Sequence, residues 1–105
     1  MAWFVLVASG VLETVWASAL AQSRGLSRPM PTALFAVAVV LSMVGLGVAL
    51  RSIPVGTGYA VWVGIGAVGV VIAGVVLSGE TVSAARALFL SLIVVGIVGL
   101  RLVES

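Results

Sequence analysis

The sequence contains no cysteine and no histidine, and only 8% of its 105 residues are charged. The first two absences exclude disulfide bonds, thiol catalysis and metal sites built from Cys or His ligands. The charged residues are five arginines and three glutamates, and no basic patch interleaves with aromatic residues as a nucleic-acid face requires. We therefore expect no cofactor, no metal site and no nucleic-acid partner.

Hydrophobic residues make up 63% of the chain, against about 45–50% in an average soluble domain. A soluble fold of this size cannot bury so much apolar surface, so a lipid bilayer must solvate most side chains. The length indicates a single domain. The first apolar run has no preceding positive charge and is longer than the roughly 7–15-residue core of a signal peptide, so we expect it to be a retained helix.

Four apolar stretches have the length of a membrane-spanning helix, which needs roughly 20 residues. We expect these spans at residues 3–21, 31–50, 55–77 and 83–102. The stretches are continuously apolar and lack the alternation of a transmembrane strand. In a bilayer, helices are also favoured because they satisfy their own backbone hydrogen bonds. The predicted fold is an all-α membrane protein with four transmembrane helices in one domain.

Two local signals support the predicted ends of these spans. Pro31 falls in the first turn of the second span, where a missing backbone N–H costs least. Ser83 precedes the fourth span and is a residue type that caps helix N-termini.

The arginines are nearly balanced between the two sides of the predicted bundle. Short loops make the spans antiparallel, so Arg51 and Arg101 lie on the side of the termini. Arg24, Arg28 and Arg86 lie on the opposite side. A clear excess of positive charge on one side normally fixes orientation. The near-balance predicts insertion in both orientations, and the alternative is one orientation with the termini outside.

Glu13 is a carboxyl group near the middle of the first span. An ionised acid there costs about 2.5–3.5 kcal/mol, whereas each neighbouring Leu or Val returns only about 0.3–0.6 kcal/mol. No arginine lies at the same depth, and desolvation favours the neutral form, so this group can exchange a proton for another cation. We predict a functional proton and cation site. The alternative is a protonated Glu13 that joins helices by hydrogen bonding.

Four other polar or aromatic side chains are candidates for the same site. Trp16 lies one turn after Glu13, shares its helix face and carries an indole N–H donor. Tyr59 and Trp62 share one face of the third span and offer aromatic walls for a cation. Ser42 adds a hydroxyl group in the middle of the second span. The alternatives are an interfacial aromatic for Tyr59 and a hydroxyl bonded to its own helix for Ser42.

The remaining features lie outside this candidate site. Gly64 and Gly66 are the expected hinge of the third span, the alternative being ordinary close packing of small residues. The fourth span has no mid-span polar group beyond Ser91 and is interpreted as an assembly surface. Glu80 and Glu104 fall at helix ends and are interpreted as solvated residues.

Two segments give the sequence a specific resemblance. GVLETVWA at residues 10–17 and IPVGTGYAVWVGIGAVG at residues 53–69 resemble the small multidrug resistance family of proton-coupled exporters, and the resemblance covers essentially the whole chain. It implies a multi-pass protein of the prokaryotic plasma membrane that forms an antiparallel homodimer. It also implies that two copies of Glu13 bind protons or a cationic substrate in one pocket, with Tyr59 and Trp62 as its aromatic residues.

Within that family, Trp16 and residues 64–69 resemble the guanidinium-exporter subtype rather than the multidrug subtype. The resemblance implies that Trp16, Ser42 and Trp62 hydrogen-bond around the glutamate. Guanidinium is planar and suits bidentate pairing with a carboxylate. The expected function is a proton-coupled antiporter that exports guanidinium or small guanidinyl cations. The alternatives are an exporter of quaternary ammonium cations and a non-transporting membrane assembly subunit.

Four positions depart from the usual family pattern. Ala21 stands where a lysine is usual, Ser9 and Gly58 stand where alanine is usual, and Val63 replaces a small polar residue. We expect the Ser9 hydroxyl to bond its own helix backbone, the alternative being a hydrogen bond donated to Glu13. The departures touch the edge of the pocket motif and leave the exact substrate, and a heteromeric pairing, open.

Overall fold

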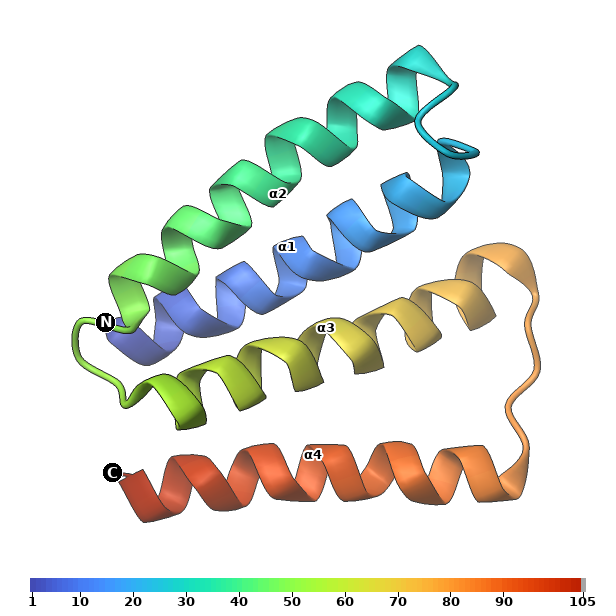
Figure 1. The fold of residues 1–105 in the computed structure, drawn as a ribbon. Coiled ribbons are helices and arrows are strands. Elements are labelled where there is room, and N and C mark those ends of the chain that lie inside the picture. The colour runs from blue at the N-terminus through green and yellow to red at the C-terminus, as the bar shows by residue number, and fades with distance from the viewer. Residues whose placement is uncertain (105) are drawn as a thin grey trace.

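The computed structural model describes residues 1–104 and contains four α-helices (Figure 1). They are α1 (Ala2–Gln22), α2 (Pro29–Ala49), α3 (Val55–Ser78) and α4 (Ala84–Glu104). All four are long and apolar enough to cross a membrane. This confirms the predicted all-helical fold with four candidate transmembrane helices, and the expected spans lie close to the observed helices.

Three helix ends have identifiable local causes. Arg86 donates its backbone N–H to the Ser83 hydroxyl over 3.1 Å, so Ser83 caps α4 as the sequence indicates. Helix α2 begins earlier than expected because Pro29 already occupies its first turn together with Pro31, and neither nitrogen is needed for an intrahelical bond there. Helix α3 ends at Gly79, which has a left-handed φ of 69° that glycine adopts without steric cost.

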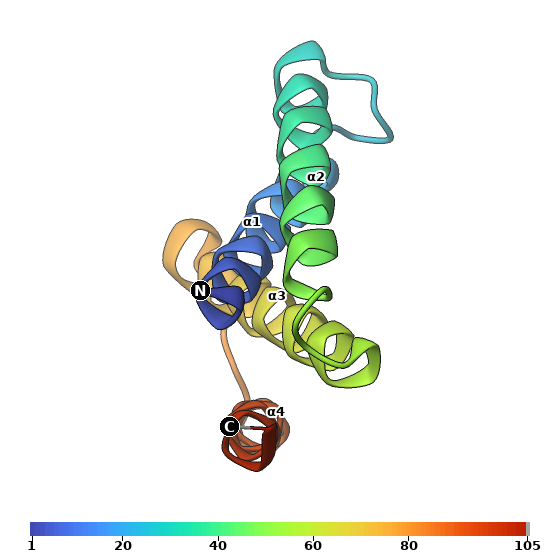
Figure 2. The same ribbon diagram turned by 90° about the vertical axis from the view of Figure 1, so that its left-hand side faces the viewer.

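Helix α1 occupies the centre of the bundle, packed along α2 on one side and α3 on the other (Figures 1 and 2). Helix α4 lies apart, next to α3. Its Arg101 reaches the first helix, where the guanidinium group lies 5.0 Å from the centre of the Trp3 ring. Both chain ends lie at the same end of the bundle. The helix that carries Glu13 therefore packs against both α2 and α3.

The tightly packed core lies toward the end of the bundle that holds the termini. It forms where the first half of α1 meets the end of α2 and the start of α3, and its buried members are Leu6, Leu46, Ala49, Ile53, Val61 and Trp62. From this core α2 and α3 diverge toward the opposite end (Figure 1). On α1, Glu13 lies two turns after the buried core residue Leu6.

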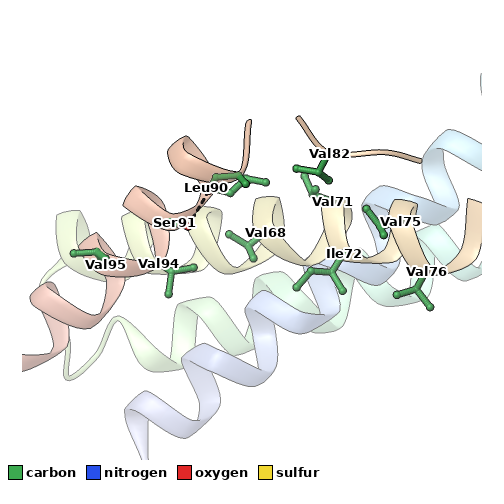
Figure 3. Close-up of a pocket in the computed structure, with 11 residues that line it drawn as sticks. Val68, Val71, Ile72, Val75, Val76, Val82, Leu90, Ser91, Val94 and Val95 are labelled. Carbon is green, nitrogen blue, oxygen red and sulfur yellow. Dashed lines mark hydrogen bonds between the residues drawn. The ribbon is translucent and has the colours of Figure 1, made fainter. Parts of the chain in front are cut away.

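Helix α4 is exposed along its length, and none of its membrane-span window is buried. A cavity of about 500 Å³ separates it from α3 and is lined almost entirely by valine, leucine and isoleucine (Figure 3). The hydroxyl of Ser91 in this cavity donates to Ala87 O over 2.8 Å, on its own helix. A cavity without a free polar group is unfavourable for a desolvated charged group.

Candidate functional site

The Glu13 carboxyl group lies directly against Gly66 of α3. A Cβ atom added at Gly66 would overlap Oε1 and Cδ of Glu13, so the absent side chain provides the space that the carboxyl group occupies. Glu13 Oε1 is buried and has no hydrogen-bond partner in the described part of the chain. Gly66, expected as a hinge residue, therefore also shapes the site by packing.

A second contact fixes α1 against α3 beside Glu13. Thr14 donates its hydroxyl to Gly66 O over 3.4 Å, and a Cβ at Gly69 would overlap that hydroxyl. One turn earlier, a Cβ at Gly10 would lie 2.8 Å from the Ile65 side chain. The two helices approach closely at these glycines. Sequence reasoning missed Thr14, although its position next to Glu13 on a glycine-facing helix was the available signal.

An open depression of about 360 Å³ borders the carboxyl group. Its lining comes from α1 and α3 and consists of Glu13, Ala17, Val63, Gly66, Ala67 and Val70. Apart from Glu13, these side chains are small or aliphatic. Glu13 is thus the one lining residue, within the described part of the protein, that can bind a cation by charge.

Ser42 and Trp62 form a hydrogen-bonded chain that ends on α1. The Trp62 indole N–H donates to Ser42 Oγ over 3.1 Å, and the Ser42 hydroxyl donates to the backbone oxygen of Ser9 over 2.7 Å. Ser9 itself donates its hydroxyl to Val5 O over 2.8 Å, the expected bond within its own helix. Ser42 bonds across helices rather than back to α2. Within one chain, Ser42 and Trp62 therefore pair with each other and with α1, not with Glu13.

Four aromatic rings form a row across three helices. Trp16 on α1 lies 6.0 Å from Phe35 of α2 in an edge-to-face arrangement and 6.4 Å from Trp62 of α3. Tyr59 extends the row, with its ring centre 5.7 Å from that of Trp62. Sequence reasoning missed Phe35, although it lies seven residues before Ser42 and so shares its helix face. Tyr59 and Trp62, the expected aromatic walls, thus lie in one row with Trp16.

Two buried polar groups of this region have no partner among the described residues. One is the acceptor Glu13 Oε1 and the other is the donor Trp16 Nε1, one helical turn further along α1. Unpaired buried polar groups cost roughly 1–3 kcal/mol each, so each of these two groups is a candidate to bind a water, an ion or another molecule. A cation can bind Glu13 Oε1, and a hydrogen-bond acceptor can bind the Trp16 indole N–H.

Comparison with known proteins agrees with this geometry. Residues 1–93 match the sequence model of the family described as Small Multidrug Resistance protein. The chain belongs to the Small Multidrug Resistance family. Membership makes it a multi-pass membrane protein and a transporter rather than an enzyme, and it confirms the resemblance found at residues 10–17 and 53–69.

Curated Small Multidrug Resistance relatives extend the match to nearly the full length. The "Guanidinium exporter" of Yersinia pestis is 52% identical over 102 residues, which cover 97% of this chain and 98% of that protein. Proteins of the same name in Salmonella typhimurium and Escherichia coli K12 are each 50% identical over 102 residues, covering 97% of both chains.

Proposed function

We propose that this protein exports guanidinium or small guanidinyl cations from the bacterial cell in exchange for protons. The observation that carries the proposal is the buried, unpartnered Oε1 of Glu13, held against Gly66 beside an open depression. The identity of about half the residues to proteins named guanidinium exporters supports the choice of cation. The site lies in a membrane bundle, so we place the protein in the inner membrane.

The chemistry of coupling follows from a single shared group. Guanidinium offers N–H donors in one plane, and a carboxylate accepts two of them in parallel. A proton on Glu13 removes the charge that attracts the cation, so the two ligands exclude each other. Coupling requires that the site switches between facing the inside and facing the outside only while a proton or a cation is bound. Protons that move inward then drive the cation outward.

We further propose that two inverted copies of this single four-helix domain form the working transporter. The nearly balanced arginines support insertion in both orientations. The exposed α4, with Gly96 and Gly99 open to close approach, supports a role in assembly. A second copy would bring another Glu13 and another Trp16 to the same site. The unpartnered Trp16 indole N–H could then donate to a carboxyl group there.

In this dimer, Glu13, Trp16, Ser42, Tyr59 and Trp62 make up the proton and substrate site. Helix α3 is continuous through residues 64–66, and Gly64 and Gly66 pack against α4 and α1 respectively. We propose that a bend at these two glycines accompanies the switch of access, because a helix without side chains at two contacts can change its packing at low cost.

The aromatic row supports one alternative, the export of quaternary ammonium cations. Aromatic rings bind such cations by cation–π attraction without any hydrogen bond. The distinguishing measurement is transport of tetraethylammonium beside guanidinium in the same vesicles. Preference for guanidinium by an order of magnitude supports our assignment, whereas preference for tetraethylammonium selects the alternative.

The decisive experiment uses proteoliposomes loaded with guanidinium under an inward proton gradient. We expect guanidinium efflux with matching proton uptake from the unaltered protein. Glu13→Gln keeps the shape but cannot bind a cation by charge, so both fluxes should vanish. Glu104→Gln removes a glutamate elsewhere and serves as the control. Equal efflux from Glu13→Gln and the unaltered protein would reject the proposed function and leave a non-transporting assembly role.

A further inference from the structure

A second cavity continues the Glu13 depression along the contact between α1 and α3. It has a volume of about 160 Å³ and shares Ala17 and Val70 with the depression. Its lining comes from the second half of both helices and from the loop after α3, and consists of Ala17, Ser18, Ala21, Gln22, Val70, Ala73, Gly74, Leu77, Ser78 and Glu80. The shared residues place the two cavities next to each other along α1 and α3, and we refer to the pair as the α1–α3 groove.

Glu80 is held over this groove by its backbone and by a glycine. Its N–H donates to Gly74 O over 3.2 Å, a bond that requires the left-handed turn at Gly79. Its carboxylate folds back onto Gly74, where an added Cβ would lie 2.7 Å from Oε2 and 3.0 Å from Oε1. A side chain at residue 74 would displace the carboxylate. Glu80 is exposed, as expected of a solvated residue. Its carboxylate nevertheless lies against Gly74 of α3.

Oxygen-bearing side chains line the same cavity as this carboxylate. Ser18 and Gln22 of α1 and Ser78 of α3 line the same cavity, and each offers an oxygen that accepts a hydrogen bond. Glu80 supplies the negative charge among these described lining residues. One carboxylate with several neutral acceptors suits a small cation that carries many N–H donors.

The two carboxyl groups are separated by a short stretch of uncharged groove. Glu13 contacts Gly66 and Glu80 contacts Gly74, which are eight residues apart on α3 and therefore about 12 Å apart along its axis. Between them the lining is mainly alanine and valine. A cation released by Glu80 thus meets Glu13 as the next negative charge along this groove.

We propose that Glu80, with Ser18, Gln22 and Ser78, forms an outer binding site that captures guanidinium-type cations before they reach Glu13. The proposal rests on the proposed function, because it assumes a cation that travels to Glu13. A carboxylate at the mouth of a low-dielectric groove raises the local concentration of cations and so speeds their capture. Since Glu80 is exposed, its site is weak and releases the cation readily.

The test is the concentration dependence of guanidinium transport by Glu80→Gln in proteoliposomes at low ionic strength. We expect KM to rise roughly two- to fivefold, as befits the loss of one exposed charge interaction, with kcat unchanged. Raising the salt concentration should shrink the difference, because salt screens exposed charges. Gly74→Ala keeps the charge but displaces the carboxylate, so it should raise KM in the same direction. Glu104→Gln, which removes a glutamate at the far end of α4, should leave KM unchanged.

The outcomes separate this inference from the proposed function. Export by the unaltered protein and its loss in Glu13→Gln test the function first. In protein that exports guanidinium, an unchanged KM for Glu80→Gln overturns the outer site alone. A lowered kcat with unchanged KM, or a KM change that salt leaves intact, also overturns it by showing a structural role. If Glu80→Gln fails to fold, Gly74→Ala decides by the same criteria.

Discussion

The Trp62 indole N–H donates to the Ser42 hydroxyl, and this bond joins α3 to α2 while Ser42 in turn bonds α1 through Ser9 O. One hydroxyl group therefore links three helices at the level of the aromatic row. Both partners are buried, with Ser42 0% and Trp62 3% exposed, so neither can turn to water if the other is removed.

Ser42→Ala should destabilise the protein by about 1–3 kcal/mol, because it leaves the Trp62 N–H unsatisfied in the core and removes the bond between α2 and Ser9 O. Thermal unfolding in detergent measures this loss. Ser91→Ala is the matched control, since Ser91 is exposed and bonds only its own helix. An equal shift for the two variants would contradict the linking role of Ser42.

Gly66→Ala should weaken guanidinium binding at least about tenfold, because the added methyl group occupies the space of the Glu13 carboxyl group. Isothermal titration with purified protein gives the affinity directly. Gly47→Ala controls for the general effect of adding a methyl group to a helix, since a Cβ there meets no described atom within 4 Å. Unaltered affinity in Gly66→Ala would show that guanidinium binding at Glu13 does not require the space beside Gly66.

Guanidinium binding should weaken as the pH falls, because a protonated Glu13 has no charge to offer. For one proton in competition, the apparent Kd rises by about tenfold per pH unit once most of the protein is protonated. Titrations at a series of pH values check this slope. A pH-independent Kd for the unaltered protein would contradict competition between protons and guanidinium for Glu13.

Gly45→Ala should lower the thermal stability, because a Cβ at residue 45 would overlap the Ser9 hydroxyl. Adding Ser9→Ala removes that hydroxyl and leaves a Cβ–Cβ approach of 3.2 Å, which a small helix shift relieves. The double variant should therefore recover much of the stability lost in Gly45→Ala. Strictly additive effects of the two changes would show that these residues do not interact.

The apolar runs made the four helices predictable, since a bilayer leaves a continuous apolar stretch few other structures. The capping role of Ser83 and the bond of Ser9 to its own helix were also predictable, because both depend on residues one turn apart. Glu13 was recognisable as a functional candidate, because an ionised acid in the middle of an apolar span has a high free-energy cost.

Contacts between helices were less accessible to sequence reasoning. Ser42 could have bonded its own helix, and only the approach of α1 decides that it donates to Ser9 O instead. The sequence predicts Gly66 as a hinge residue. The rotation of α1 about its axis also makes it a neighbour of the Glu13 carboxyl group. Such outcomes depend on how each helix is rotated about its axis, and a uniformly apolar helix surface contains little information on that rotation.

The aromatic row also equips the protein with an internal optical probe. Trp16 and Trp62 lie next to each other in the aromatic row, whereas Trp3 lies at the start of α1 beneath Arg101. Replacing Trp3 with phenylalanine would leave all indole fluorescence in the aromatic row of the proposed site. Changes in occupancy and in the spacing of the helices could then be followed by emission in real time, with no dye attached to a protein that has no cysteine to label.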